Sequence, residues 1–486
     1  MSLILLYLFS LLTTMLCEDR LIFVLTHFRH GARAPQKYFD DKLKVDYALE
    51  KWDSPGELTA MGKRMHYALG LRNRERYITN TSFLSPKFDP HEMLIYSTRF
   101  NRTLLSVAAQ LQGLYPFGTG EELESDQIEK SKPPLNLSYD VESDLADLNN
   151  YSLPGKMSLA PIRMINDLER KMIIYDISSC LWKRDEMREK NLKNSEPLKK
   201  LVDDFFKNYT ANLKKLYGTD HGKKFDIHLF DNFCDAFIAG RTELKEMKNL
   251  TEAGLNTDEM LKTCFEFMKL NFRDWISGDD ERVLPTLESS KMMREMIHYM
   301  KQRIEADIKN ENISLELQDY SRPKMIMVSA HDSTTSMWEM FLIKIFLDNN
   351  ATKYYDFPTF ATQFSFEVVR DKSLDNKTKT EDDYTINFYF NDRLFLNKSV
   401  NEFIKTVEDN LYSDEKINEI CKFDAKKDEQ EEEEEKGLYF TLMIVFAATT
   451  GLFLILTIFF IIKATRSKNS ELINKQGQLL NSYDGN

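Results

Sequence analysis

The sequence predicts an α/β fold in which a helical insertion separates two α/β segments and a single helix near the C-terminus spans a membrane. Short apolar, β-prone runs alternate with helical patterns in two parts of the chain. A stretch rich in Lys, Glu, Leu and Met lies between these parts, and one long uncharged segment follows them. Of the 486 residues, 42% are hydrophobic and 29% are charged. This composition is globular and excludes low-complexity disorder.

The apolar runs that predict strands are short and lie far apart in the chain. Residues 21–26, 93–96 and 325–328 are apolar on both faces, which is typical of parallel strands buried between helices. Residues 364–369 and 384–390 alternate more, and we expect them at an edge of the sheet.

Helical patterns follow two of these runs, at residues 103–115 and 334–346. Residues 155–310 differ, because they contain long stretches of 3.6-residue periodicity and no clear strand. These stretches cover residues 163–185, 198–217 and 291–310. We interpret 155–310 as a helical insertion between α/β segments at 18–154 and 311–422.

Residues 1–17 carry no charged side chain and are apolar almost throughout, and Glu18, Asp19 and Arg20 follow. Because this run is short for a membrane span, it predicts a secretory signal peptide. A buried first strand is the alternative interpretation.

The segment from Leu438 to Ile462 has no charged side chain and is long enough to cross a hydrocarbon core of about 30 Å. Basic residues follow it from Lys463, whereas an acidic stretch at 423–437 precedes it. The positive-inside rule therefore predicts a single-pass type I membrane protein with an acidic stalk and a cytoplasmic tail at 463–486.

The cysteines and sequons agree with an oxidising compartment. If Cys17 leaves with the signal peptide, Cys180, Cys234, Cys264 and Cys421 remain, and four cysteines allow three pairings. No Cys-x-x-Cys pair occurs, so a zinc site is not expected. Ten Asn-x-Ser/Thr sequons predict a glycoprotein. They are Asn80, Asn101, Asn136, Asn150, Asn208, Asn249, Asn312, Asn350, Asn376 and Asn397.

The formal net charge is −12, from 65 Lys and Arg against 77 Asp and Glu. Such an acidic protein is a poor nucleic-acid binder, because affinity for nucleic acids comes mainly from neutralising phosphates. We therefore expect no nucleic-acid partner. Any phosphate that the protein handles must be bound by a few local arginines.

Residues that suit phosphate chemistry follow three of the predicted strands. Residues 29–35, after the first strand, read Arg-His-Gly-Ala-Arg-Ala-Pro. Arginine forks bind phosphate oxygens, and an imidazole beside them can attack phosphorus. Arg102 lies near the start of the helix that follows the second strand, where an anion is favoured. His331 and Asp332 follow the third strand, and a protonated carboxyl can assist an alkoxide leaving group.

Each of these residues also has a plainer interpretation. Arg29, His30 and Arg33 can belong to a polar loop, and Arg102 can be an ordinary exposed arginine. Asp332 can be the N-cap of the next helix, and His331 a loop histidine. Their arrival together at three strand ends, which open α/β sheets use for ligands, favours a shared site.

These residues resemble the signatures of the histidine acid phosphatases. Residues 29–35 match the family's RHGxRxP signature, and His331-Asp332 match its second, His-Asp signature. The resemblance covers most of residues 20–421, including residues 56–62 and the segment 97–103. The signal peptide and anchor are similar to those of the membrane-bound, lysosomal-type members.

The resemblance implies a phosphoglycerate-mutase-like α/β domain with a helical cap, which uses no metal or cofactor. It implies that His30 is the nucleophile that becomes phosphohistidine and that Asp332 donates a proton to the leaving group. Arg29, Arg33 and Arg102 would form the phosphate clamp. His331 would be a further phosphate ligand.

The resemblance also implies a reaction, a compartment and a disulfide pattern. The substrates would be small phosphomonoesters, hydrolysed in the lysosomal or endosomal lumen or at the cell surface. A homodimer is one possible oligomeric state, which the sequence does not determine. The disulfide pairs would be Cys180 with Cys421 and Cys234 with Cys264.

Two positions depart from the family pattern. Asn101 stands where the family usually has Asp, and a glycan there would clash with catalysis, so we expect this sequon to be unused. Ser333 replaces the usual Thr, which should be harmless.

Two other readings stay open. An inositol-polyphosphate phosphatase or phytase would share the site but usually has extra basic residues around it, and the acidic chain disfavours this. A catalytically inactive, membrane-tethered binding protein would have lost His30, an arginine or Asp332, and all are present. A Cys-x5-Arg phosphatase loop is absent after Cys234, where Gly240 stands in place of the arginine, and there is no P-loop.

Overall fold

The computed structural model describes most of the chain before residue 422 and a few residues after it. The described residues are 19–36, 54–128, 130–131, 145–164, 181–217, 227–243, 251–252, 254, 256–277, 283–310, 322–347, 355–421, 443, 457–458 and 461–463. Contacts divide the chain into one unit of Met1–Ile417 and a second of Asn418–Asn486. The first unit contains the sheet, the helices around it and every residue of the candidate site.

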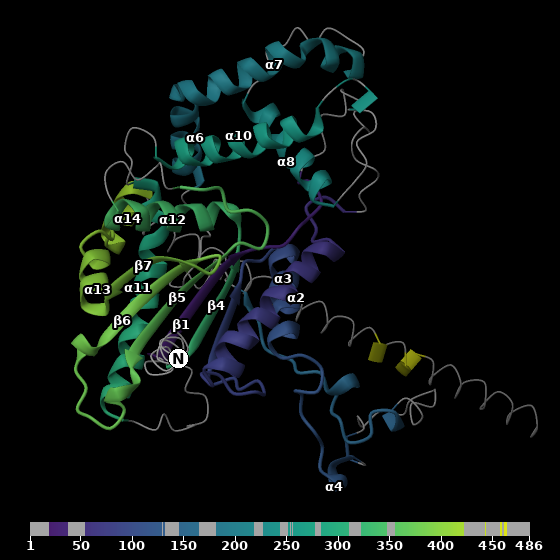
Figure 1. Ribbon diagram of the computed structural model, residues 1–486. Coiled ribbons are helices and arrows are strands. Elements are labelled where there is room, and N and C mark those ends of the chain that lie inside the picture. The colour runs from purple at the N-terminus through teal and green to yellow at the C-terminus, as the bar shows by residue number, and fades with distance from the viewer. Residues whose placement is uncertain are drawn as a thin grey trace, which may run out of the picture. The chain divides into compact units, whose positions relative to one another are not determined.

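A seven-stranded sheet forms the centre of the first unit, in the order β3-β2-β4-β1-β5-β6-β7 (Figure 1). The first four strands of this order are parallel to one another, and the last three are added antiparallel. The strands are β1 (Asp19–Arg29), β2 (Met93–Ser97), β3 (Arg163–Met164), β4 (Met325–Ala330), β5 (Gln363–Asp371), β6 (Tyr384–Phe390) and β7 (Arg393–Ser399). All five predicted runs are strands.

The expected sheet edge is wrong. β5 lies between β1 and β6 and is buried over eight of its nine residues, so it is an inner strand. The edge is β7, which the sequence did not reveal because its residues Arg-Leu-Phe-Leu-Asn-Lys-Ser are mostly polar or partly exposed. The opposite edge is the two-residue β3, at a position where we expected a helix.

Helices cover both faces of the sheet. One face packs on α11 (Val283–Ile308), α12 (Asp332–Phe346) and α13 (Val400–Glu408), through a core that includes Phe23 and Phe366. The other face packs on α3 (Asn101–Leu114) and a π-helical turn at Glu75–Asn80, through Val24, Phe28 and Val107. α2 (Ala60–Arg74) precedes that turn and packs along α3.

The remaining long helices form a second core. They are α6 (Leu181–Asn194), α7 (Glu196–Tyr217), α8 (Ile227–Thr242) and α10 (Thr257–Ser277). Their core of Phe205, Phe230 and Phe267 also contains Met337 and Met340 of α12. These helices, which we call the cap, therefore rest on a helix of the α/β domain.

The predicted bounds of the insertion, 155–310, are too wide at both ends. β3 pairs with β2 in the central sheet, and α11 packs its apolar face on that sheet. Long 3.6-residue periodicity does not distinguish a cap helix from one that covers a sheet, because both bury one apolar face.

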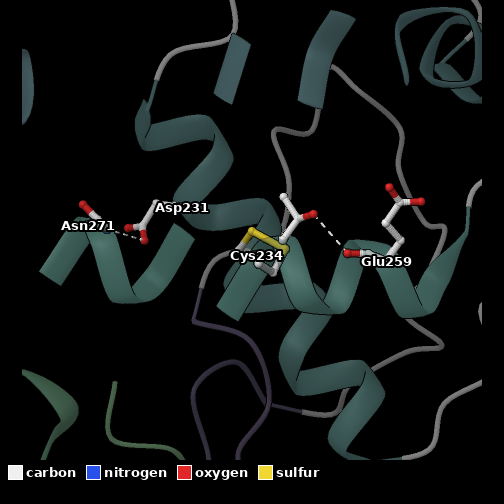
Figure 2. The surroundings of a disulfide bond; sticks show 6 residues. Asp231, Cys234, Glu259 and Asn271 are labelled. Carbon is white, nitrogen blue, oxygen red and sulfur yellow. Dashed lines mark hydrogen bonds between the residues drawn. A yellow bond between two sulfur atoms is a disulfide. The ribbon is translucent and has the colours of Figure 1, made fainter. Parts of the chain in front are cut away.

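A disulfide joins α8 to α10 inside the cap. Figure 2 shows the disulfide at Cys234. Its two residues, Cys234 and Cys264, are fully buried, with Cα atoms 5.0 Å apart. This is the pair implied by the resemblance. Cys421, at the end of α14 (Asp414–Cys421), is also disulfide-bonded. Its expected partner Cys180 lies outside the described residues, so that pairing stays a prediction.

Several predicted segments fall outside the described residues. They include the signal peptide at 1–17, the stalk at 423–437, nearly all of residues 438–462 and the tail after 463. Among the helices that are described, none combines the length and the apolar character needed to cross a bilayer. The sequons at Asn136, Asn249, Asn312 and Asn350 also lie outside.

Candidate active site

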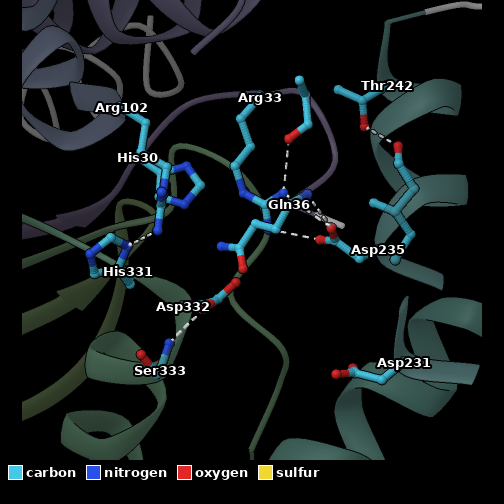
Figure 3. Close-up of polar contacts among 12 residues, drawn as sticks. His30, Arg33, Gln36, Arg102, Asp231, Asp235, Thr242, His331, Asp332 and Ser333 are labelled. Carbon is cyan, nitrogen blue, oxygen red and sulfur yellow. Dashed lines mark hydrogen bonds and ion pairs between the residues drawn. The ribbon is translucent and has the colours of Figure 1, made fainter. Parts of the chain in front are cut away.

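The register of the parallel strands brings all six predicted site residues to one edge of the sheet. Arg29, at the end of β1, is paired with Ala330 of β4, and Ser97 of β2 is paired with Ser329. The chain then continues from β1 into His30, whose N–H donates to the carbonyl of Ala330 (3.0 Å). The six residues are Arg29, which pairs with Asp332, and the five labelled in Figure 3: His30, Arg33, Arg102, His331 and Asp332.

The first unusual feature is a buried imidazole. His30 is 1% exposed, and its Nδ1 lies 2.8 Å from the carbonyl oxygen of Gly31. Because a carbonyl can only accept, Nδ1 must carry the proton, and Nε2 of the neutral ring keeps its lone pair. Burial, followed by the positive charges of Arg29 and Arg33, holds the pKa of His30 well below its usual value. Burial and the arginines therefore favour the neutral ring, with a nucleophilic nitrogen at Nε2.

Arg29 and Asp332 form a buried ion pair. Nη2 of Arg29 lies 2.6 Å from Oδ2 of the carboxylate, and Nη1 donates to the carbonyl of Pro358 (2.6 Å). The guanidinium also lies over the ring of Phe360, 4.4 Å from its centroid. Burial opposes ionisation of Asp332, but Arg29 and Arg33 outweigh burial, so its pKa lies below the usual value. Asp332 is thus ionised while no ligand is bound.

Arg102 and His331 are hydrogen-bonded to each other. Nη2 of Arg102 donates to Nδ1 of His331 (3.4 Å), because a guanidinium cannot accept. The proton of the neutral ring is then on Nε2, which donates to Thr98 Oγ1 (3.0 Å). Burial and then Arg102 lower the pKa of His331 to about 3, whereas burial lowers that of Arg102 only to about 10. The clamp arginine stays charged and the histidine stays neutral.

The hydrogen bonds of His331 bear on the expectation that it is a phosphate ligand. Both nitrogens of His331 already bond to protein groups, so the ring has no N–H left for a phosphate oxygen. To act as a phosphate ligand, His331 would have to release Thr98. In the described arrangement it positions Arg102.

Arg33 meets a residue that the sequence did not single out. Its two terminal nitrogens bind both carboxylate oxygens of Asp235 on α8, at 2.7 and 3.2 Å, and the backbone N–H of Gln36 donates to the same carboxylate (3.0 Å) (Figure 3). Burial opposes the charge of Arg33, but Asp235 outweighs it and raises the pKa. No local motif marks Asp235, because only the folding of the cap brings it to the loop 202 residues away.

The three arginines share a further property. Nε of Arg29, of Arg33 and of Arg102 is buried without a hydrogen-bond acceptor among the described residues. A buried N–H without an acceptor is costly, and three in one site call for a common acceptor. An oxyanion with several oxygens satisfies that need.

A cation site is not seen. The described part of the chain contains no group of three or more His, Cys, Asp or Glu side chains that could hold a metal ion.

Two glycines bring the loop after β1 against the start of α2. A Cβ on Gly31 would lie 2.4 Å from the carbonyl oxygen of Gly62, and a Cβ on Gly62 would lie 2.1 Å from that of Ala32. Thr59, the N-cap of α2, also donates through Oγ1 to the carbonyl of Ala32 (3.1 Å). This close backbone approach explains why residues 31 and 62 are glycines, and it holds the loop that carries His30 against α2.

We predict that Gly62→Ala pushes the loop away from α2 and lowers turnover by about 100-fold, because a displacement near 1 Å has that effect on a catalytic group. Steady-state kinetics on a phosphomonoester measures it. Gly70→Ala is the matched control, since its Cβ would lie 2.0 Å from the carbonyl of Gln110 in α3 instead of the loop. It should lower stability and largely retain turnover. Equal loss of turnover in both variants would contradict the positioning role of Gly62.

Known proteins resemble this chain in sequence over different lengths. Mouse testicular acid phosphatase is 40% identical over 124 residues, which are 25% of this chain and 28% of that protein. Bovine prostatic acid phosphatase is 25% identical over 325 residues, 66% of this chain and 68% of that protein. The match to the testicular protein therefore spans little more than a quarter of its length.

Among solved structures, the apo form of Hafnia alvei phytase matches with a TM-score of 0.49 and 13% identity, over 83% of this chain and 98% of that chain. The family model described as histidine phosphatase superfamily (branch 2) matches residues 20–391. This range includes β1 through β6 and all six residues of the site. Because the match covers well over half of the sequence, the chain belongs to branch 2 of the histidine phosphatase superfamily.

Proposed function

We propose that the protein is an acid phosphatase that hydrolyses phosphate monoesters through a phosphohistidine at His30. The observation that carries this proposal is the neutral, buried imidazole of His30, which lies close to three arginines whose Nε–H groups have no acceptor among the described residues. A nucleophile for phosphorus must be unprotonated, and its surroundings must stabilise negative charge on the transferred group. The lowered pKa of His30 favours the first requirement, and the three arginines supply the second.

The reaction assigns one role to each residue. Nε2 of His30 attacks phosphorus while the bond to the leaving oxygen breaks, and Asp332 gives its proton to that oxygen. Arg29, Arg33 and Arg102 bind the phosphoryl oxygens. Water then attacks the phosphohistidine and gives a proton to Asp332, and the electron pair of the N–P bond returns to Nε2.

The depressed pKa of Asp332 determines where the proton comes from. The free enzyme holds Asp332 ionised against Arg29. A phosphomonoester has a second pKa near 6, so in mild acid it arrives as a monoanion with a proton of its own. Its negative charge beside Arg29 and Arg33 favours transfer of that proton to Asp332. The proposal therefore links acidic pH to substrate ionisation.

We also propose that the enzyme acts in the lysosomal or endosomal lumen or at the cell surface, as a glycosylated type I membrane protein. The uncharged segment at 438–462, the basic residues after it and the ten sequons support this. The site suits acid, as an acidic compartment requires.

We predict that His30→Ala lowers kcat by a factor on the order of 10⁴ or more, because the covalent route is lost. Phosphate release from a phosphomonoester at pH 5 measures it. His298→Ala is the control, since His298 is exposed on α11. It should keep full activity. Substantial turnover in His30→Ala would overturn the nucleophile assignment.

We predict that Asp332→Asn separates substrates by leaving group. Alkyl esters need a proton on the leaving oxygen, so their kcat should fall by about 10²–10⁴. Aryl esters such as nitrophenyl phosphate should lose much less. In the native enzyme, kcat/KM should fall about tenfold for each pH unit above the second pKa of the substrate, near 6.

Asp332→Asn also removes the ion pair with Arg29, and this affects the kcat for both substrates equally. The ratio of the loss in kcat for alkyl esters to that for aryl esters therefore measures the contribution of the proton from Asp332. Equal losses for alkyl and aryl esters would show that Asp332 only holds Arg29.

A further inference from the structure

We propose that Asp235 of the cap is a specificity-determining residue, which restricts the site to substrates with one phosphate and a compact, uncharged leaving group. It would exclude polyphosphorylated substrates such as inositol hexakisphosphate. This inference rests on the proposed phosphatase function and deepens it. Three observations carry it: the geometry of the Arg33 pair, the charge balance of the site, and the cavity beside it.

The geometry leaves Arg33 little capacity for a second anion. Both oxygens of Asp235 bind its terminal nitrogens, and Nη1 also donates to the carbonyl of Ala34 (3.1 Å). Nε–H and the second N–H of Nη2 have no acceptor among the residues that the structure describes. The backbone N–H of Gln36 fixes the carboxylate at this position. Arg33 can therefore contribute to binding one phosphate. The N–H groups of Nη1 and Nη2 that donate to Asp235 are not available to a second one.

The charges of the site nearly balance. Asp332 pairs with Arg29 and Asp235 pairs with Arg33, whereas Arg102 forms no ion pair with any residue that the structure describes. The two site histidines are neutral. Three arginines against two carboxylates leave one net positive charge, which suits the monoanion of a phosphomonoester.

Further carboxylates lie near Arg33, Arg102 and the loop after β1. Asp231 lies one turn before Asp235 on α8, where it acts on Arg33 and also pairs with Arg188 (3.3 Å). Glu243, after the end of α8, accepts from Thr59, and Glu57 accepts from Asn101 Nδ2 (3.2 Å). A substrate with several phosphates would bring negative charges toward these acids.

A cavity of about 160 Å³ adjoins Arg29 and Asp235 between the loop and the cap. Among the described residues, Arg29 and Asp235 are the charged ones that line it, and its apolar lining includes Ile238, Phe265 and Phe360. None of these described lining residues is a lysine. An apolar cavity of about 150 Å³ holds benzene, so this space accommodates a single ring or a short aliphatic group. Apart from Arg29, which pairs with Asp332, its described lining offers no cation to a second phosphate.

The test compares the purified full-length protein with Asp235→Asn, by phosphate release from nitrophenyl phosphate and from inositol hexakisphosphate. The native enzyme should prefer the monoester by at least about 100-fold in kcat/KM. Asp235→Asn should narrow this ratio at least tenfold, mainly by lowering KM for the hexakisphosphate. Asp235→Glu, which retains the charge, should keep the native ratio.

Asp258→Asn is the control for charge alone. Asp258 is an exposed cap carboxylate that pairs with Arg241, and its removal should leave the ratio unchanged. If Asp235→Asn loses both activities equally, Asp235 only positions Arg33 and the inference is overturned. If Asp258→Asn narrows the ratio as much, the effect is one of net charge and the inference is overturned as well.

A measurement on the native protein does not depend on the folding of any variant. Inositol hexakisphosphate should inhibit hydrolysis of nitrophenyl phosphate more weakly than inorganic phosphate does. Stronger inhibition would overturn the inference. Efficient hydrolysis of both esters would overturn the inference and leave the phosphatase proposal intact, whereas hydrolysis of neither would overturn the phosphatase proposal itself.

Discussion

Two buried guanidinium groups and a third that is half-buried lie around one buried imidazole, and much of the site is arranged to meet this constraint. Arg29 and Arg33 are 4% and 3% exposed, and His30 is 1% exposed. Burying a cation is expensive unless it is paired. Asp332 supplies one partner and Asp235 another, while Arg102 lies against His331 and Phe100. The Nε–H groups of the three arginines, which have no acceptor among the described residues, favour binding of an oxyanion. Burial and then the charges of the arginines favour the neutral form of His30.

The partners of these cations come from separate layers of the fold. Asp332 begins α12, which packs on the sheet, whereas Asp235 belongs to α8 of the cap. The cap core contains residues of α12, so the same helix supports both carboxylates. The disulfide between Cys234 and Cys264 lies next to Asp235 in sequence and holds α8 to α10. The cap therefore belongs to the site and is not a separate attachment.

Local residues were sufficient to predict the ends of three strands and the helices after two of them. Buried parallel strands such as β1 and β4 are apolar on both faces, and their boundaries follow from the polar residues after them. The candidate site was predictable to the same extent, because His30, Arg102 and Asp332 each follow a recognisable strand. β7 was not predicted from the sequence, because an edge strand does not need an apolar face. Asp235 escaped because its role depends on tertiary packing alone.

The central claim is that Nε2 of His30 becomes phosphorylated, because Nδ1 is held as a donor by the carbonyl of Gly31. The most direct measurement is to quench the enzyme during turnover and identify the phosphorylated residue and ring nitrogen by mass spectrometry and ³¹P NMR. We expect a phosphate on Nε2 of His30, absent from His30→Ala. A phosphate on Nδ1, on His331 or on no residue would contradict the claim.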